Sequence, residues 1–413
     1  MTDFFRSRWV EVGDHVRVVA EGGLPAGFRA AGAAAGIKPS GGLDVGLLVS
    51  DEPDTTSAAR FTVSGVQAAP VLVTRERCRL DALRAVAANS GNANAATGGP
   101  GLDTAAHMQG SGAMVARVPE DQVAVASTGV IGVRLDPDTV MRGLLAASRE
   151  LRPDGDADFA QAIMTTDAYE KRATLEVALP SGTVRLCAQA KGAGMISPRF
   201  ATLLCFVETD AALESATADL LLGVTVQRSF GRISVDGQLS TNDTVVLLCS
   251  GASGVKVAPE SEDELRFGEA LDALLRQLAL LIVADGEGAR RVGRVVVRGG
   301  NGEGVERAAR AIADSPLVKT ALYGGDPNWG RIAQAVGAAL PGTAPLPLDV
   351  SIEGVTVCSG GFGVPVDEAA LNAAVRGDEV EYVVGLPGDG FETEVFFSDL
   401  GHGYIEINAE YTT

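Results

Sequence analysis

The sequence predicts a layered α/β or α+β fold, because strand-like runs, glycine turns and an amphipathic helix are interleaved along the chain. Ala173–Leu179 and Thr183–Ala190 are rich in β-forming residues, and the turn Pro180–Gly182 between them predicts a hairpin. Leu203–Glu208 and Thr244–Ser250 are mainly apolar and of strand length. This pattern is typical of buried strands, although a short buried helix has the same one.

The clearest helix is predicted over Glu262–Ala284. Ser261 and Glu264 form a capping-box pattern at its start, and the glycines of Asp285–Gly288 end it. Between them, apolar residues recur at three- and four-residue steps, which gives one stripe facing a core: Phe267, Leu271, Leu274, Leu278 and Leu281. Asp326-Pro327 predicts a second helix start, with the aspartate as N-cap and the proline in the first helical position.

Composition excludes several classes of function. Of the 413 residues, 46% are apolar and 21% charged, the balance of a protein with a sizeable core. The 34 Lys and Arg against 53 Asp and Glu give a net charge of −19. A field of this sign repels nucleic-acid backbones and anionic membrane surfaces, so neither is an expected partner. Any anionic substrate therefore needs a local cationic pocket.

Cysteine and histidine are scattered. The three histidines and five cysteines show no metal-ligand spacing, so no metal site is expected. Dispersed cysteines within apolar runs are typical of a reducing compartment. The first residues lack the apolar stretch of a signal peptide, and no uncharged run approaches the ~18 residues of a membrane span. We expect a cytoplasmic protein.

Few routes to acyl chemistry fit these residues. The chain has no G-x-S-x-G and no G-x-x-x-x-G-K-[ST] motif, and Lys191–Gly194 is followed by strand-like residues rather than a helix. One remaining route is a threonine nucleophile whose own α-amine is the base, which requires cleavage of the preceding peptide bond. Thr202 follows a glycine- and proline-containing turn and opens an apolar run. On pattern alone, an ordinary hairpin exit stays the alternative for this segment.

Nine stretches in order resemble the ornithine acetyltransferase family, also called bifunctional glutamate/ornithine N-acetyltransferases. They are Pro25–Gly32, Asn89–Ala95, Ser127–Gly132, Ile163–Asp167, Lys191–Leu204, Ser240–Asp243, Asp285–Gly288, Asp326–Arg331 and Ile407–Thr413. The resemblance spans nearly the whole chain. It implies an αββα-type layered sandwich related to self-processing aminopeptidases, with a smaller carboxy-terminal domain over about 290–395.

The resemblance also implies self-cleavage between Ala201 and Thr202. Residues 1–201 would form an α chain and 202–413 a β chain, both sharing the main sandwich and assembling as two α and two β chains. Thr202 would carry an acetyl group from N-acetylornithine to glutamate, a step of arginine biosynthesis. An acyl-enzyme of this kind is ping-pong covalent catalysis.

By the same resemblance, Thr128 and Gly129 form the oxyanion hole. The positions that bind substrate in the family are Thr165, Lys191, Thr202, Glu287, Asn408 and Thr413. Taken alone, Ser127–Gly129 is a turn pattern, and a glutamate after a helix is usually solvated. No resident cofactor is implied, and acetyl-coenzyme A stays open as a second donor.

Some positions depart from the family pattern, and one matching motif is not assigned a catalytic role. Arg199-Phe200, Gly231 and Arg290 stand where the family commonly has other residues, which puts the acyl acceptor and the rate of self-cleavage in question. Asn89–Asn94 is expected to be a turn-rich loop near the site. Three alternatives remain: a paralogue acting on another acylated amino acid, an amidase or aminopeptidase with the same threonine, and an uncleaved binding protein.

Overall fold

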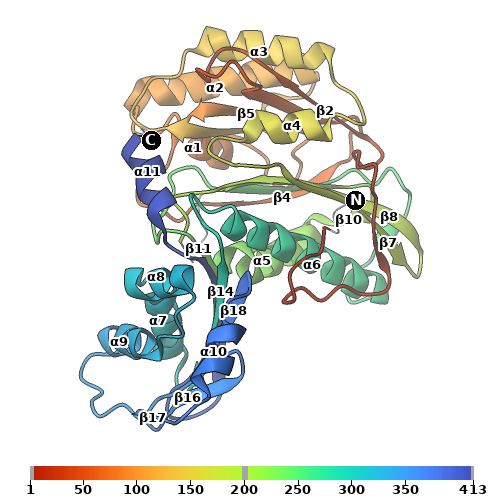
Figure 1. Cartoon of the computed structure of the whole chain (residues 1–413). Coiled ribbons are helices and arrows are strands. Elements are labelled where there is room, and N and C mark those ends of the chain that lie inside the picture. Colours follow the sequence, from red (N-terminus) through yellow and green to blue (C-terminus); the bar gives the residue numbers. More distant parts are fainter. Residues whose placement is uncertain (1–3, 198–202, 411–413) are drawn as a thin grey trace.

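The computed structural model describes residues 4–197 and 203–410, and Figure 1 shows four stacked layers with a second unit beside them. Helices cover the outer face of one sheet, a second sheet lies against the inner face of the first, and two helices cover the far side. This α/β/β/α arrangement confirms the predicted layered sandwich of mixed α/β class.

The first half of the sandwich is a four-stranded sheet under three helices. The sheet order is β2-β3-β5-β6, with β5 and β6 parallel and the other pairs antiparallel. The bounds are β2 Phe28–Ala33, β3 Val45–Ser50, β5 Ala85–Asn92 and β6 Val123–Val130, with helices α1 Ala69–Arg77, α2 Gly98–Ala116 and α3 Pro137–Arg149.

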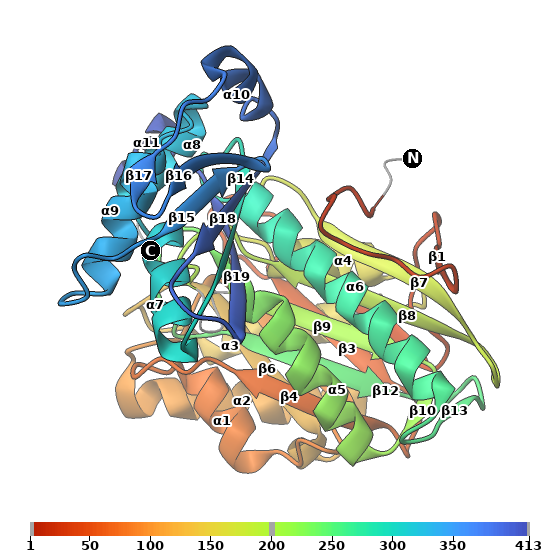
Figure 2. The same ribbon diagram turned by 90° about the horizontal axis from the view of Figure 1, so that it is seen from below.

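The second half is a six-stranded sheet in the order β1-β7-β8-β9-β12-β4, with β9 and β12 parallel. Figure 2 shows α5 and α6 lying across this sheet. The bounds are β1 Val16–Val18, β4 Thr56–Phe61, β7 Lys171–Leu179, β8 Gly182–Lys191, β9 Leu204–Thr209 and β12 Thr244–Cys249, with helices α5 Ser215–Arg228 and α6 Glu262–Ala284. A short parallel pair, β10 Ala212–Leu213 with β13 Lys256–Val257, lies beside them.

Alternate residues of the central strands serve different cores. In β9, Cys205 and Val207 pack with the α5–α6 side, whereas Leu204 and Phe206 point into the layer between the two sheets. Helix α4 (Asp156–Ile163) also enters that layer, where the Phe159 ring meets the Phe206 ring edge-on at 5.4 Å. Because successive strand side chains face opposite ways, one apolar run supplies both cores.

A second unit with its own core is built from the chain after α6, together with the short strand β11 before it. Its seven-stranded sheet has the order β11-β19-β14-β18-β15-β16-β17. The strands are β11 Ile233–Ser234, β14 Val292–Gly299, β15 Asp349–Ile352, β16 Val355–Ser359, β17 Phe362–Gly363, β18 Glu379–Gly385 and β19 Phe391–Ser398. The helices are α7 Gly302–Ala313, α8 Pro316–Gly324, α9 Trp329–Ala339 and α10 Glu368–Ala374.

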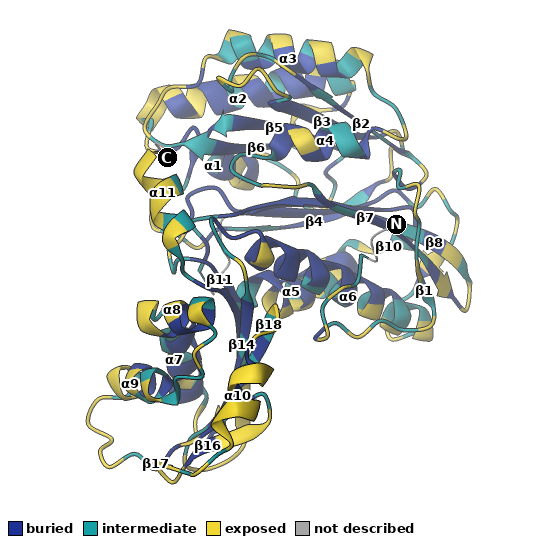
Figure 3. Cartoon of the chain, viewed as in Figure 1, coloured by how far each residue is buried: buried dark blue, intermediate teal, exposed yellow. Residues whose placement is uncertain are grey.

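The last helix, α11 (His402–Glu410), returns to the ends of the sandwich sheets, and none of its residues is buried (Figures 1 and 3). β19 joins the two units, because Phe396 packs in the core beneath α5 and α6 while Phe397 packs in the second core. Across the two described segments of the chain, no helix combines the length and apolarity needed to cross a bilayer.

Two strands and a helix have the positions that the sequence predicts. The predicted hairpin is β7–β8, and Leu179 pairs with Gly182 across its turn. Helix α6 has the predicted bounds, and Ser261 Oγ accepts a hydrogen bond from Glu264 N at 3.2 Å. The Glu264 carboxylate accepts from Glu260 N at 2.6 Å, one residue before the N-cap.

Two local predictions are wrong. The helix expected from Asp326-Pro327 begins at Trp329, because Asn328 is the N-cap and its Oδ1 accepts from Arg331 N at 3.2 Å. The loop expected over Asn89–Asn94 is wrong for Asn89–Asn92, which end strand β5, whereas Ala93 and Asn94 lie beyond the strand. Parallel pairing with β6 carries the strand on through an irregular register at Gly91 and Asn92, and Asn89 Oδ1 accepts from Ser127 Oγ at 2.6 Å.

Glu208 is fully buried in β9, and its burial predicts that the stability of the fold depends on pH. Its Oε2 accepts from Gln189 Nε2 at 3.0 Å, Oε1 has no partner among the described residues, and burial raises the Glu208 pKa to about 8. The folded chain therefore keeps this proton up to a higher pH than the unfolded chain, so stability is lost as pH rises from about 4.3 to about 8.

We expect Glu208→Gln, which mimics the protonated acid, to be more stable than the wild type at pH 8. The gain in free energy of unfolding at pH 8 should exceed the gain at pH 5 by at least about 1.4 kcal/mol, the equivalent of one pKa unit. Urea unfolding at both pH values measures this. Glu176→Gln is the control: this half-buried β7 carboxylate pairs with Arg17 and Arg185, which lower its pKa, so its titration lies below pH 5 and no such change is expected. Equal gains for Glu208→Gln at both pH values would contradict the assignment.

Candidate active site

A cavity of about 250 Å³ lies where the ends of both sheets meet α11. Its walls come from segments far apart in sequence: the end of β6, the loop after α4, the end of β8 and the following turn, the 236–242 loop, Glu287 just beyond α6, and α11. The lining residues are Thr128, Gly129, Ile131, Thr165, Thr166, Lys191, Gly194, Met195, Asp236, Gln238, Ser240, Thr241, Asn242, Glu287, Tyr404 and Asn408.

Thr128 and Gly129 lie at the end of β6, next to the end of its parallel partner β5. Gly129 has φ +130°, and a Cβ there would lie 2.4 Å from Gly91 C and 2.5 Å from Asn92 N. Only glycine allows the two strand ends to approach this closely. The expectation of a simple turn is wrong, since Ser127–Gly129 is strand and presents Thr128 to the cavity.

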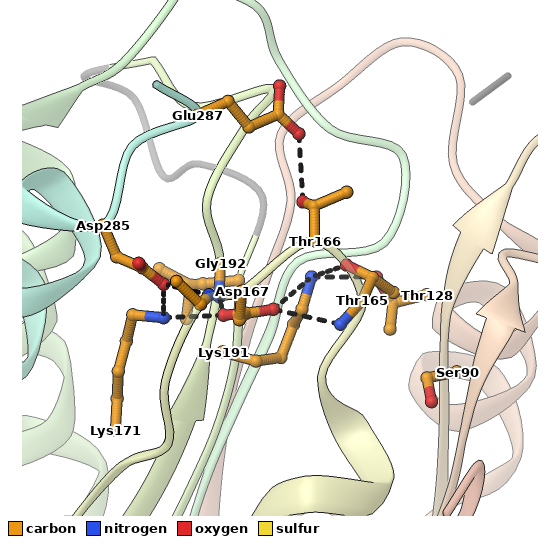
Figure 4. Close-up of polar contacts among 12 residues, drawn as sticks. Ser90, Thr128, Thr165, Thr166, Asp167, Lys171, Lys191, Gly192, Asp285 and Glu287 are labelled. Carbon is orange, nitrogen blue, oxygen red and sulfur yellow. Dashed lines mark hydrogen bonds and ion pairs between the residues drawn. The ribbon is translucent and has the colours of Figure 1, made fainter. Parts of the chain in front are cut away.

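Lys191 ends β8 and is 2% exposed. Its Nζ lies 2.8 Å from Thr165 Oγ1, 3.4 Å from Thr128 Oγ1 and 3.8 Å from Asp167 Oδ2 (Figure 4). Burial lowers the pKa of Lys191, and the carboxylate of Asp167 opposes this effect. Lys191 is the one lysine among the described residues that line the cavity. Its ammonium group is fixed by the Thr128 and Thr165 hydroxyls and by the Asp167 carboxylate.

The Asp167 side chain is fully buried behind that wall. Its Oδ1 accepts from Gly192 N at 2.7 Å, and its Oδ2 accepts from Thr165 N at 3.0 Å. Burial alone would raise the Asp167 pKa, but the ammonium groups of Lys191 and Lys171 outweigh burial and hold it well below its ordinary value. Asp167 therefore stays ionised at neutral pH.

Glu287 is 9% exposed, so the reading of this residue as solvated surface is wrong. Its Oε1 accepts from Thr166 Oγ1 at 2.9 Å, and its Oε2 accepts from Asn408 Nδ2 at 2.7 Å. The backbone N–H of Glu287 donates to Ala193 O at 2.9 Å. The Glu287 carboxylate therefore ties the loop after α4 to α11, and its backbone N–H adds the turn after β8.

The chain on both sides of residues 198–202 is anchored to the cavity by aspartates. Asp236 accepts from Met195 N at 2.6 Å and from Ile196 N at 2.9 Å. On the other side, Asp243 Oδ1 accepts from Leu203 N at 2.9 Å. Asp243 Oδ2 is buried without a partner among the described residues, and burial raises the Asp243 pKa well above its ordinary value.

Six of the residues singled out by the sequence therefore line one cavity: Thr128, Gly129, Thr165, Lys191, Glu287 and Asn408. Ala201, Thr202 and Thr413, like Arg199 and Phe200, lie outside the described residues. Sequence reasoning did not assign roles to Asp167, Asp236 and Asp243. Asp167 and Asp243 each end one of the quoted motifs, which was a signal, whereas no local pattern marks Asp236.

Two of the positions that depart from the family pattern lie away from the cavity lining. Gly231 is in a 3₁₀ turn after α5, and the Arg290 guanidinium stacks on the Tyr323 ring at 5.0 Å. Nearby Arg294 is paired with Glu381 and Glu394. Within the described residues, no group of three or more His, Cys, Asp and Glu side chains could hold a metal ion.

The chain is similar to known proteins over nearly its whole length. It is 42% identical to the arginine biosynthesis bifunctional protein ArgJ of Symbiobacterium thermophilum over 393 residues, 94% of this chain and 98% of that protein. It is 40% identical to the glutamate N-acetyltransferase of Methanocaldococcus jannaschii over 411 residues, 96% of this chain and all of that protein. The solved ornithine acetyltransferase of Mycobacterium tuberculosis, complexed with ornithine, is 37% identical with a TM-score of 0.41, covering 46% of this chain and 99% of that one.

An aminopeptidase from Ochrobactrum anthropi, described as a variant of the Ntn hydrolase fold, is 10% identical with a TM-score of 0.42, over 67% of this chain and 89% of that one. The ArgJ family model matches residues 29–413. With that match over nearly the whole length, and with relatives at about 40% identity that the chain covers almost completely, this protein belongs to the ArgJ family.

Proposed function

We propose that this chain transfers an acetyl group from N²-acetyl-L-ornithine to L-glutamate, as a glutamate N-acetyltransferase of arginine biosynthesis. The observation that carries the proposal is the convergence of Thr128, Gly129, Thr165, Lys191, Glu287 and Asn408 on one cavity. At about 250 Å³ the cavity is below the ~300–1,000 Å³ of pockets for drug-sized ligands, and so suits an amino-acid substrate.

In this proposal the chain first cleaves itself. Thr202 Oγ attacks the Ala201 carbonyl carbon, the bond from that carbon to Thr202 N breaks, and the nitrogen takes the hydroxyl proton. Water then hydrolyses the resulting ester, which releases the Ala201 carboxylate and restores the Thr202 hydroxyl. The products are chains 1–201 and 202–413. Thr202 now has a free α-amine, whose ordinary pKa of ~7.7–8.0 suits a general base near neutral pH.

Acetyl transfer follows in two halves. The Thr202 amine takes the proton of the Thr202 hydroxyl as Oγ attacks the acetyl carbonyl, and the oxyanion is stabilised by the Thr128 hydroxyl and the Gly129 N–H. The amide bond then breaks and the departing nitrogen takes the proton. Ornithine is released, and Thr202 carries the acetyl group as an ester. The glutamate amine then attacks the ester carbonyl carbon, and the bond from that carbon to Thr202 Oγ breaks. The proton lost by the attacking amine passes through the Thr202 α-amine to Oγ, which restores the hydroxyl as N-acetylglutamate leaves.

The charges on the cavity wall fit such substrates. Lys191 supplies a cation for a substrate carboxylate, and Glu287 supplies an anion for an ammonium group. Thr165 and Asn408 each contact one of these charged groups, and we assign Thr413 to the same substrate site. Binding that orients the acetyl carbonyl at Thr202 lowers the entropic part of the barrier.

Further parts of the proposal concern partners and surroundings. We propose two α and two β chains per molecule, no resident cofactor, and acetyl-coenzyme A as an alternative donor. The five cysteines are all free thiols and four of them are buried, which supports a reducing, cytoplasmic location.

The function is tested by following radiolabelled acetyl from N-acetylornithine into N-acetylglutamate or acetate. We expect the label to be transferred to glutamate. We also expect ornithine to be released before glutamate binds. Release of acetate at the same rate without glutamate would support the amidase or aminopeptidase alternative. A panel of amino-acid acceptors, with acetyl-coenzyme A as a second donor, separates glutamate from another acceptor.

Thr202→Ala should leave one uncut chain of 42.3 kDa with no acetyl transfer, because both the nucleophile and the cleavage step are lost. Intact mass and the label assay measure the two outcomes. Thr202→Ser is the matched control and should still cleave and transfer, since it keeps a hydroxyl. Wild-type turnover in Thr202→Ala would refute the assignment.

Thr128→Ala should lower kcat by ~10²–10³, the cost typical of one lost oxyanion donor. It should slow self-cleavage too, because the same hydroxyl would stabilise both tetrahedral intermediates. Thr128→Ser keeps the donor and should stay within about tenfold of the wild type. An unchanged transfer rate in Thr128→Ala would remove this residue from the mechanism.

A further inference from the structure

A second lysine, Lys171, is fully buried directly behind the cavity wall and does not line the cavity. Its Nζ lies 2.7 Å from Asp167 Oδ1 and 2.6 Å from Asp285 Oδ2 (Figure 4). The Tyr169 carbonyl accepts a longer hydrogen bond from it at 3.4 Å. Burying an ammonium group is costly unless it is paired and hydrogen-bonded, and here two carboxylates meet that need.

The two carboxylates hold different parts of the cavity wall. Asp167 accepts hydrogen bonds from the backbone N–H of Thr165, whose hydroxyl contacts the Lys191 ammonium, and from that of Gly192, which follows Lys191 in the chain. Asp285 caps the end of α6, accepts from Ala168 N at 3.0 Å, and precedes Glu287 by two residues. Lys171 thus joins the loop after α4 to the segment that carries Glu287.

Four buried charged side chains form a cluster behind and on the cavity wall, and their charges balance. Lys171 and Lys191 carry two positive charges, and Asp167 and Asp285 carry two negative ones. Asp167 Oδ1 is occupied by Lys171 and Gly192, so Oδ2 is the oxygen that faces Lys191, at 3.8 Å. The Lys191 ammonium in turn donates to Thr128 Oγ1, which leaves the Thr128 proton for another acceptor.

We propose that Lys171, clamped between Asp167 and Asp285, is a positioning residue that fixes Lys191 and, through it, the Thr128 hydroxyl for acetyl transfer. This inference rests on the acetyl transfer proposed above. A buried ion pair is weak evidence for stability, since apolar replacements of buried pairs are often neutral or stabilising. We therefore expect loss of the Lys171 ion pairs to change the position of Lys191 and Thr128 more than the stability of the fold.

The decisive variant is Lys171→Met with Asp285→Asn. It removes one charge of each sign, so the remaining Lys191 and Asp167 still balance, and the amide oxygen introduced in place of the Asp285 carboxylate can still accept from Ala168 N. We expect near-wild-type thermal unfolding, a kcat at least tenfold lower, and a KM for N-acetylornithine within about threefold. A kcat loss without a KM change indicates an interaction made in the transition state.

A second measurement does not need turnover. Hydrogen exchange at Gly192 and Thr165, whose N–H groups donate to Asp167, should be at least tenfold faster in the double variant. Arg294→Met is the matched control, because Arg294 also lies between two carboxylates but away from the cavity. It should leave kcat and these exchange rates unchanged.

The outcomes separate the two ideas. An inactive wild type would overturn the proposed function, while exchange would still decide the role of Lys171. Wild-type kcat, or wild-type exchange, in the double variant would overturn the positioning role. If the double variant does not fold, Asp285→Asn alone keeps Lys171 and should still lower kcat at least threefold; unchanged kcat there would also overturn it.

Discussion

The face-to-face packing of two sheets is the constraint on which the site depends. Leu204 and Phe206 of β9, with Val246 and Leu248 of β12, fill the layer between the sheets, while their neighbours along each strand face α5 and α6. A shift of one residue in either strand would exchange the two faces. With the sheets packed in this register, the ends of β6 and β8 come together, and the cavity is formed at those ends.

The same register explains why so acidic a chain can hold a cation at the cavity. A net charge of −19 gives no general attraction for an anionic substrate, so the positive charge must be local. Lys191 points from the end of β8 toward Thr128 on the other sheet, and Asp167 compensates it from the loop after α4. The cation at the site therefore belongs to a balanced buried cluster.

How far the sequence predicts the structure depends on the range of the interactions. Helix α6 was predicted with its bounds, because its cap and its apolar stripe are local. The start of α9 was missed by two residues, since Asp326 and Asn328 are both good caps and local pattern cannot rank them. The pattern of Asn89–Asn92 predicts a loop because the partners that make it strand are distant in sequence: Ser127 of β6 donates to Asn89, and Ser90 donates to Ala162 O.

The candidate site shows the same division. The resemblance identified Thr128, Lys191 and Glu287, but the burial of Glu287 depends on Thr166 and Asn408, 121 residues away on either side. Asp236 has no local signature, because its partners Met195 and Ile196 are about 40 residues earlier. Contacts of this kind appear only once the sheets are stacked.

The sandwich also determines what a break between Ala201 and Thr202 would do. β8 and β9 are antiparallel neighbours, and Lys191 pairs with Leu204 at the end of their ladder. Residues on both sides of 198–202 are held by separate aspartates, Asp236 and Asp243. Neither anchor depends on the peptide bond between the two proposed chains.

Separation of those chains would have a much larger cost than cleavage. The core beneath α5 and α6 takes Leu186 and Ala188 from β8, and Val207 and Leu247 from β9 and β12. Pulling the chains apart would expose this core and break the β8–β9 ladder, at ~25 cal/mol for each Å² of apolar surface. Cleavage would therefore free an amine at Thr202 while the sheets that form the cavity stay assembled.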